Sequence, residues 1–391
     1  MISLSDAIDL ILDTPTLERQ TEYVPLKKAI NRVLAADIIT DMDVPSFNKS
    51  AMDGYAMREQ DFLQPLQVVE TVAAGKKPEK VIGPGQCAKI MTGAIIPAGA
   101  DMVVMKEVVS LVDEHTIVIN AARSAKNILY QGEDQKEGDL VLNEGVKLNP
   151  AHLGILAMAG CTVVPVYRRP VVGLFSTGSE LVDPSQVPVP PQIRNSNSVQ
   201  IEAQLEQWGA QVINLGIIYD ELDTIKGAIA QLLPLVDGIV FTGGASVGDL
   251  DFSSRALASL GVEVKFNKVA IQPGKPALFG TLSSRWIFGL AGNPVSSLLQ
   301  SELFIKPLLL GVYAGQKLPA PLQFPIGQTM TRKKAERDLF FPVKLVGHHV
   351  FPIEYHGSAH LMAYGEAFGL ACFPLGQLQL NENTMIDVRQ V

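Results

Sequence analysis

The feature that most constrains this chain is an alternation of short apolar runs and helical segments between residues 170 and 312. The apolar runs are Val171–Phe175, Val212–Ile217, Gly238–Phe241, Val264–Val269 and Trp286–Leu290. The helical segments between and after them are 198–208, 222–233, 252–260 and 294–309. Near-continuous apolar runs that alternate with helices predict an open parallel β-sheet covered by helices.

The segments on either side have a different pattern. Residues 3–13 predict an amphipathic helix that Ser3 or Ser5 can cap, and a second helix is expected over 27–36. From 44 to 130, short β-type runs are separated by glycine and proline and predict a β-rich module inserted into the chain. These runs are Leu66–Thr71, Gln86–Met91, Met102–Val109 and Thr116–Ile119. Beyond residue 318 apolar and polar residues alternate again, which predicts a small C-terminal β domain.

Composition limits the function classes. The 391 residues carry 32 basic and 40 acidic side chains, for a net charge of −8, and the longest run of basic residues is Arg332-Lys333-Lys334. Such a surface repels a phosphate backbone, so nucleic-acid binding is not expected. The N-terminal stretch carries Asp6, Asp9 and Asp13 and lacks a basic region typical of a signal peptide. We therefore expect a cytoplasmic protein without a membrane-spanning segment.

Three loops of the α/β region contain the residues expected at an anion-binding site. They are Ser176-Thr177-Gly178-Ser179-Glu180, Thr242-Gly243-Gly244-Ala245-Ser246-Val247-Gly248-Asp249 and Ala291-Gly292-Asn293-Pro294-Val295-Ser296-Ser297. Each follows an apolar run, and loops at the carboxyl ends of parallel strands bring backbone N–H groups toward a ligand. In the third loop, Asn293 suits a helix cap and Pro294 the first helical turn. The alternative is that all three are ordinary strand-to-helix turns.

Acidic residues are concentrated beside these loops: Glu180, Asp220, Glu221, Asp249 and Asp251. Carboxylates repel an anionic ligand unless a hard divalent cation lies between them, so this pattern favours Mg²⁺. Lys275, in Gln272-Pro273-Gly274-Lys275-Pro276, is the candidate fixed positive charge, although a lysine in a turn can also be a plain surface residue.

Other enzyme classes fit the motifs less well. Residues 244–248 match the G-x-S-x-G pattern of serine hydrolases, but Asp249-Leu250-Asp251 intervenes before any helix. The sequence contains no G-x-x-x-x-G-K-[ST] phosphate loop, and Gly83-Pro84-Gly85 lacks the third glycine of a dinucleotide-binding fingerprint.

An ordered series of motifs resembles the molybdopterin molybdenumtransferases of the MoeA and gephyrin E-domain family. The series begins with Pro45-Ser46-Phe47-Asn48-Lys49-Ser50-Ala51-Met52-Asp53-Gly54-Tyr55-Ala56. It continues with Met91-Thr92-Gly93, Gly132-Glu133-Asp134, Thr177-Gly178-Ser179-Glu180-Leu181, Asn195-Ser196-Asn197, the loop at 242–251, Pro273-Gly274-Lys275-Pro276 and Gly292-Asn293-Pro294-Val295-Ser296. The similarity covers residues from about 3 to the end and is weakest in the C-terminal domain.

The resemblance implies a multi-domain fold of α/β plus β type. Its four domains would be a segmented N-terminal domain (1–43 plus 131–168), an inserted β-rich domain (44–130), a molybdopterin-binding parallel α/β domain (169–314) and a small C-terminal β-barrel (315–391). It also implies a homodimer with active sites at the subunit interface. Molybdopterin adenylyltransferase and molybdoenzyme apoproteins or their chaperones are the further candidate partners.

The implied activity is a molybdenum insertase that takes molybdate and adenylylated molybdopterin and releases AMP with Mg²⁺. The implied catalytic residues are Asp53, Thr92, Glu180, Asp251 and Lys275, and the metal ligands Glu180, Asp249 and Asp251. The implied substrate-binding residues are Asp134, Thr177, Gly178, Ser179, Asp220, Thr242, Gly243, Gly244, Ser246, Pro273, Gly274, Pro276, Gly292, Asn293, Pro294, Ser296 and Arg337. Lys275, Ser296 and Arg337 would bind the oxyanion, because cationic and hydroxyl donors suit a tetrahedral dianion.

The sequence departs from the family pattern at a few positions. Gln272 stands where a basic residue is common, Ala291 replaces a proline, and Lys49 replaces a small residue. Two other functions remain open: a non-catalytic molybdopterin-binding scaffold, and a molybdopterin adenylyltransferase that shares only the α/β domain.

Overall fold

The computed structural model describes residues 1–14, 19–243, 252–315 and 320–390. The chain divides into two compact units. Unit 1 contains Met1–Glu22, Asn31–Val33 and Tyr167–Val391, and unit 2 contains Tyr23–Ile30 and Leu34–Val166. Each unit is described separately below.

A six-stranded sheet in the order β16-β13-β17-β21-β20-β18 forms the centre of unit 1. The strands are β13 (Val171–Thr177), β16 (Gln211–Ile218), β17 (Gly238–Thr242), β18 (Glu263–Lys268), β20 (Pro276–Leu282) and β21 (Arg285–Leu290). The first four strands of the order are mutually parallel, which confirms the predicted parallel core. Strand β20, which was not predicted, runs antiparallel to both neighbours.

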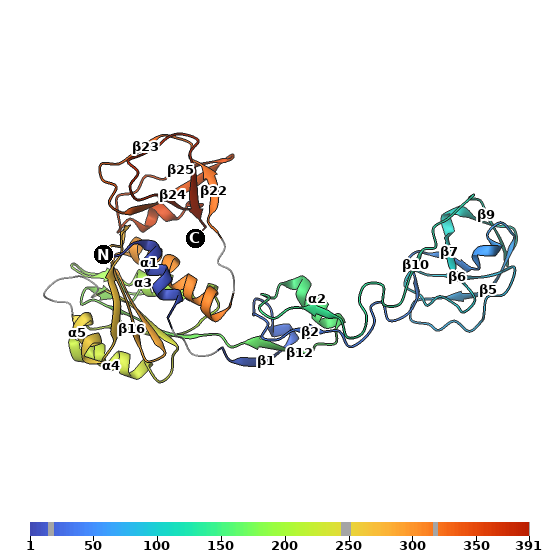
Figure 1. Ribbon diagram of the computed structural model, residues 1–391, viewed down its shortest axis with the longest axis horizontal. Helices are drawn as coiled ribbons and strands as arrows, with labels where there is room; N and C mark the ends of the chain where they lie inside the picture. The colour runs from blue at the N-terminus through green and yellow to red at the C-terminus, as the bar shows by residue number, and fades with distance from the viewer. Residues whose placement is uncertain (15–18, 244–251, 316–319, 391) are drawn as a thin grey trace. The chain divides into compact units, whose positions relative to one another are not determined.

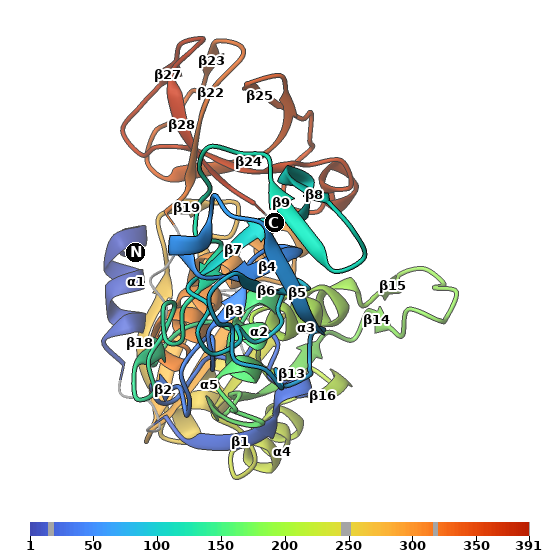
Figure 2. The same ribbon diagram turned by 90° about the vertical axis from the view of Figure 1, so that its right-hand side faces the viewer.

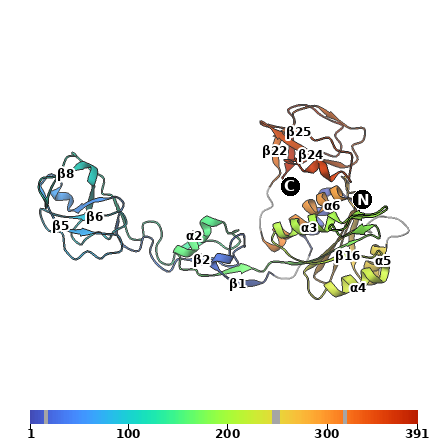
Figure 3. The same ribbon diagram turned by 180° about the vertical axis from the view of Figure 1, so that it is seen from behind.

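Helices cover both faces of this sheet (Figures 1 and 3). On one face α1 (Leu4–Leu12), α3 (Ser196–Gln207) and the helix that begins as α6 (Pro294–Gln300) enclose one apolar core. On the other face α4 (Leu222–Leu232) and α5 (Phe252–Ser259) enclose a second core. As expected, Ser3 caps α1: its hydroxyl accepts from the Asp6 amide, and the Asp6 carboxylate accepts from the Ser3 amide.

The last helix of the α/β region is its longest. It continues from α6 through the π-helical turns η4 (Ser301–Ile305) and η5 (Leu308–Tyr313). By length and composition Pro294–Tyr313 could cross a membrane, with a mean hydropathy of 1.3. However, 72% of that stretch is buried inside the domain, so it forms part of the core of unit 1.

A β domain follows the α/β region in unit 1 and packs beside the long helix (Figure 1). Its sheet has the order β19-β24-β26-β28-β22, and β25 pairs with β24. The strands of this domain are β19 (Ile271–Gln272), β22 (Leu322–Pro325), β23 (Met330–Thr331), β24 (Asp338–Val346), β25 (His349–Pro352), β26 (Gly369–Phe373), β27 (Gln379–Leu380) and β28 (Met385–Arg389). Since β19 belongs to the α/β region but pairs with β24, the two domains share a sheet.

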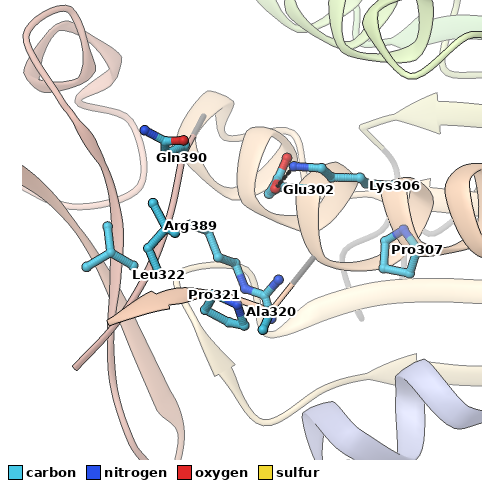
Figure 4. A pocket seen from close by; sticks show the side chains of 9 residues that line it. Glu302, Lys306, Pro307, Ala320, Pro321, Leu322, Arg389 and Gln390 are labelled. Carbon is cyan, nitrogen blue, oxygen red and sulfur yellow. Dashed lines mark hydrogen bonds and ion pairs between the residues drawn. The ribbon is translucent and has the colours of Figure 1, made fainter. Parts of the chain in front are cut away.

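The long helix and the C-terminal strands also border a cavity of about 200 Å³ (Figure 4). Glu302 and Lys306 form an ion pair on the helix, and burial raises the pKa of the Glu302 carboxyl. Arg389, from β28, lies across the cavity from this pair and contributes a further positive charge. A short two-stranded arm, β14 (Leu181–Val182) and β15 (Ile193–Arg194), projects from the α/β domain (Figure 2).

Unit 2 contains a six-stranded sheet in the order β7-β4-β6-β5-β9-β8. Its strands are β4 (Gly54–Met57), β5 (Leu66–Val72), β6 (Gln86–Ile90), β7 (Met102–Met105), β8 (Val109–Leu111) and β9 (Thr116–Ile119). Three of the predicted β-runs are confirmed, whereas the 3-10 turn η3 (Lys106–Val108) divides the fourth, Met102–Val109, between β7 and β8. Separate small cores lie on the two faces of this sheet.

A further core in unit 2 draws residues from both sides of the β-rich module, including Leu34, Ile38, Leu148 and Leu156. Around it lie α2 (Pro150–Met158) and the strand pairs β1–β12 and β2–β11, whereas β3–β10 belongs with the β-rich module. Their bounds are β1 (Thr21–Pro25), β2 (Ile38–Ile39), β3 (Lys49–Ser50), β10 (Ile128–Leu129), β11 (Leu140–Leu142) and β12 (Val163–Tyr167). The four domain boundaries given above stay predictions.

The prediction of a helix over 27–36 was wrong. Only a single 3-10 turn forms, at Leu26–Lys28, and Asn31 then adopts a positive φ of 61°. Leu34 bridges to Val166, and the buried Arg32 donates to the Tyr167 carbonyl at 2.7 Å. Long-range pairing of this segment therefore outweighs its local helical pattern.

Candidate functional site

The loops at the carboxyl ends of the parallel strands enclose a cavity of about 420 Å³ in unit 1. Many of the predicted site residues line it: Thr177, Gly178, Glu180, Asp220, Thr242, Gly243, Pro276, Gly292 and Asn293. The structure therefore brings the three predicted loops together at one edge of the sheet. Leu181, Ile193, Asn197 and Ala291 complete the lining.

A buried polar network supports the loops behind this cavity. The Ser176 hydroxyl lies 2.8 Å from the Ser198 hydroxyl and 2.9 Å from that of Thr242, and all three side chains are buried. The Asn195 carboxamide caps α3 by accepting from the Ser198 amide. Because buried polar groups are costly to separate from their partners, this network fixes the ends of β13 and β17 relative to α3.

Gly243 allows the first two loops to approach each other closely. Its φ is +86°, and a Cβ at this position would lie 2.1 Å from the Thr177 carbonyl oxygen. Any other residue would force the two loops apart, which explains the glycine in physical terms.

One buried glutamine, Gln300, joins the Pro273-Gly274-Lys275-Pro276 segment to the third loop, which begins at Ala291. The Gln300 Nε2 group donates to the carbonyls of Gly274 at 2.8 Å and Pro276 at 2.6 Å. Its Oε1 atom accepts from the Ala291 amide at 2.8 Å. The side chain is fully buried, so it sets the spacing between the segment of Lys275 and the start of α6.

The predicted oxyanion residues come from three elements. Lys275 is exposed, and within the described residues its ammonium group has no hydrogen-bond or ion-pair partner. Ser296 lies in the first turn of α6 and is buried, while Pro294 occupies the first helical position. Arg337 precedes β24, whose residue Asp338 pairs with Ile271, so this arginine lies in the strand pairing that leads into the Pro273-Gly274-Lys275 loop.

Asn293 stands at the N-cap position of α6, as predicted, but its side chain makes no capping hydrogen bond. Its Nδ2 group instead donates to the Ser358 hydroxyl at 2.8 Å. The Val295 amide donates to the Ser358 carbonyl at 3.0 Å, so the C-terminal domain satisfies the first free amide of the helix. Ser358 was not predicted as a site residue.

The structure describes only part of the predicted metal-binding set. Glu180 lines the cavity, and its carboxylate has no hydrogen-bond partner among the residues that the structure describes. Asp249 and Asp251 lie outside the described residues, as do Gly244 and Ser246. Within the described part of the chain, no group of three or more His, Cys, Asp or Glu side chains could hold a metal. Ser179 is exposed beside Glu180.

A second polar cluster lies in unit 2, around Asp53. This residue precedes β4, and the register places it beside the ends of β6 and β7. Its Oδ1 atom accepts from the Thr92 amide at 2.9 Å and the Thr92 hydroxyl at 2.8 Å, and Lys106 Nζ lies 3.1 Å from Oδ2.

These donors lower the pKa of Asp53 to about 2, with the Thr92 amide as the largest cause, then its hydroxyl, then Lys106. Asp53 is therefore ionised at neutral pH. Asp134 also lies in unit 2, where it is exposed and its amide donates to the Val44 carbonyl.

Residues 2–160 match the family described as MoeA N-terminal region (domain I and II), and residues 173–311 match the probable molybdopterin binding domain. The molybdopterin molybdenumtransferase of Haemophilus influenzae is 38% identical over 344 residues, which cover 87% of this chain and 85% of the relative. The chain belongs to the molybdopterin molybdenumtransferase (MoeA) family.

Further comparisons extend the match over the whole length. The molybdopterin molybdenumtransferase of Staphylococcus epidermidis is 33% identical over 400 residues, covering 99% of this chain and 95% of the relative. A crystal structure of the MoeA molybdopterin biosynthesis protein of Pyrococcus horikoshii has a TM-score of 0.86 at 28% identity, with 100% of both chains covered. Membership of the family makes this chain a transferase of molybdenum cofactor biosynthesis, and the predicted fold class is confirmed.

Proposed function

We propose that this member of the MoeA family inserts molybdenum by transferring molybdate to adenylylated molybdopterin, with Mg²⁺-dependent release of AMP in the cytoplasm. The observation that carries the proposal is the cavity of unit 1. Three glycine- and hydroxyl-containing loops and Glu180 line it, together with Pro276, whose neighbour Lys275 has no partner for its ammonium group within the described residues. A ligand that carries phosphates, together with a hard cation, satisfies both kinds of group.

The side chains divide into roles by their chemistry. Thr177, Thr242 and the glycines at 178, 243 and 292 suit the body and phosphate of molybdopterin, because they leave room and backbone donors at the cavity wall. Lys275, Ser296 and Arg337 would bind molybdate through charge-assisted hydrogen bonds.

Glu180, with Asp249 and Asp251, would hold Mg²⁺. The fit rests on the Glu180 carboxylate, which lines the cavity without a hydrogen-bond partner in the described chain. When bound, the cation would neutralise charge on the phosphoanhydride oxygens. Asp53 would act as an ionised, fixed carboxylate, since Thr92 and Lys106 already occupy both of its oxygens.

Two parallel incubations separate the proposal from its two rivals. In the first, purified protein is incubated with Mg²⁺, molybdate and adenylylated molybdopterin, and AMP and protein-bound molybdenum are measured. AMP release together with molybdenum on the dithiolene supports the insertase. In the second, the protein is incubated with Mg²⁺, ATP and molybdopterin; formation of adenylylated molybdopterin there, without molybdenum transfer in the first, identifies an adenylyltransferase. Binding of molybdopterin without either reaction identifies a scaffold, and both of these outcomes contradict the proposal.

A further inference from the structure

The side chain of Asn197, from α3, lines the cavity with only one of its two polar atoms hydrogen-bonded to a described residue. It is 8% exposed, and its Nδ2 group donates to the Gly292 carbonyl at 2.7 Å. That bond fixes the orientation of the carboxamide, because the opposite orientation would place two oxygens against each other. The Oδ1 atom is consequently fixed as an acceptor, and it has no hydrogen-bond partner among the described residues.

A buried acceptor without a partner is costly, and native structures rarely keep one without a reason. Here the acceptor belongs to a residue that lines the cavity, next to the carboxylates of Glu180 and Asp220. The Asn197 oxygen therefore offers an acceptor to the ligand, in contrast to the anion-binding donor of Lys275. A ligand group that meets it must carry N–H or O–H donors.

We infer that Asn197 is a specificity-determining residue that accepts a hydrogen bond from the donor edge of the pterin ring. The inference rests on the proposed function, since the pterin is the donor-bearing part of molybdopterin. The amino and ring N–H groups of a pterin are donors in a planar array, and a fixed carboxamide oxygen complements one of them. The Nδ2 bond to Gly292 serves a second purpose, because it ties the acceptor to another loop of the cavity lining.

The same helix provides a matched control. Gln200 lies one turn further along α3, and its Nε2 group donates to the Pro294 carbonyl at 2.8 Å and the Ser297 hydroxyl at 2.9 Å. Its Oε1 atom is also without a partner in the described chain. Gln200 is not part of the cavity lining, however. A substitution of Gln200 therefore shows how much ligand affinity is lost when only the contact between α3 and α6 is broken.

The experiment measures the Kd for molybdopterin by fluorescence titration in the wild-type chain and in Asn197→Leu and Gln200→Leu. Leucine at position 197 removes the acceptor and the bond to Gly292, whereas leucine at position 200 removes the bonds to Pro294 and Ser297 outside the cavity lining. We expect Asn197→Leu to raise Kd about tenfold, equivalent to ~1.4 kcal/mol, because a ligand donor is left without a partner. Gln200→Leu should stay within about threefold of the wild type. Thermal unfolding confirms that each variant is folded.

A second measurement separates binding from chemistry. In the AMP-release assay, Asn197→Leu should raise KM for adenylylated molybdopterin while kcat at saturation stays nearly constant, as for loss of a contact made equally in ground and transition states. A Kd of Asn197→Leu within about threefold of the wild type, or a loss in Gln200→Leu as large as in Asn197→Leu, would overturn the inference and leave the proposed function standing. If wild-type protein does not bind molybdopterin, the proposed function fails first.

Discussion

The carboxylate of Asp53 in unit 2 and the acceptors around the cavity of unit 1 differ in how far the protein fills their hydrogen-bonding capacity. Both oxygens of Asp53 accept from Thr92 or Lys106, although the Asp53 side chain is 40% exposed. Around the cavity, the Glu180 carboxylate and the Asn197 oxygen have no hydrogen-bond partner in the described chain. The first arrangement fixes a charge in advance, and the second reserves its acceptors for ligands.

Removal of divalent metal is expected to have the largest effect, because it should abolish AMP release and leave Asp53 unchanged. Because Glu180, Asp249 and Asp251 repel a phosphoanhydride, AMP release is expected to need Mg²⁺ or Mn²⁺ and to vanish with chelator. The pKa of Asp53 should not change under the same treatment, since its donors belong to the protein. Full activity in EDTA after metal removal would contradict the predicted role of the cavity acids.

Mixed dimers test whether the two kinds of site work together across subunits. Asp53 and Asp251 belong to different compact units, and the family resemblance implies a homodimer with shared sites. Asp53→Ala and Asp251→Ala chains, each inactive alone, are unfolded and refolded together. Random pairing makes about half the dimers mixed, and each then carries one intact site, so roughly a quarter of wild-type activity should return.

The control for this experiment is each variant refolded by itself, which should stay inactive. Mixed dimers must be confirmed by mass. If they form and no activity returns, both residues serve a site within one chain.

Charge removal at Lys275 should have an intermediate effect. Lys275→Ala is expected to raise the molybdate requirement roughly tenfold or more, because a charge-assisted hydrogen bond contributes about 1.5–3 kcal/mol. The matched change Gln272→Lys adds a charge in the same loop and should lower the requirement. An AMP-release titration against molybdate measures both, and an unchanged dependence in Lys275→Ala would leave it a plain turn residue.

The smallest expected change is in the titration of Asp53. Thr92→Val and Lys106→Met each remove one donor, so each should raise the pKa of Asp53 from about 2 toward the ordinary aspartate value of 3.8. The Thr92 amide remains in both variants, which keeps the pKa below 3.8. Carboxyl chemical shifts recorded against pH by NMR give the value directly, and Lys126→Met, which breaks another exposed ion pair in unit 2, is the control.

The stability of unit 2 follows from the same pKa. A carboxyl whose folded pKa is lowered stabilises the fold above its unfolded pKa, and this contribution is lost as the pH falls from about 4 to 2. Both variants should therefore show less acid-dependent change in unfolding midpoint over this window. An unchanged acid profile would show that the donors of Asp53 matter little for folding.

Much of the fold was predictable because its pattern is local. The run at 238–241 is apolar throughout and is buried as β17, and Thr116–Ile119 was predicted to the residue. The failures are positions where distant partners decide. Residues 27–36 have a helical pattern, yet Leu34 and Arg32 are held by Val166 and Tyr167.

The candidate site shows the same division. The glycine-rich loops follow strands, so their meeting at one edge of the sheet could be expected. Lys106 lies 53 residues from Asp53, and Ser358 lies 65 residues from Asn293, so no spacing rule relates them. For Asn197 a signal was available in the Asn195-Ser196-Asn197 motif, but only the structure separates the capping residue from the one that lines the cavity.

The bonding of Gln300 decides which side chains its position can accept. Two carbonyls approach its nitrogen and one amide approaches its oxygen. Glutamate has the same shape but would present a lone pair to the Gly274 and Pro276 carbonyls, and lysine would present a donor to the Ala291 amide. Methionine would fill the volume and satisfy none of the three groups. This position is therefore restricted by the direction of its hydrogen bonds, and a substitution that looks conservative by size or polarity is expected to separate the two loops that it joins.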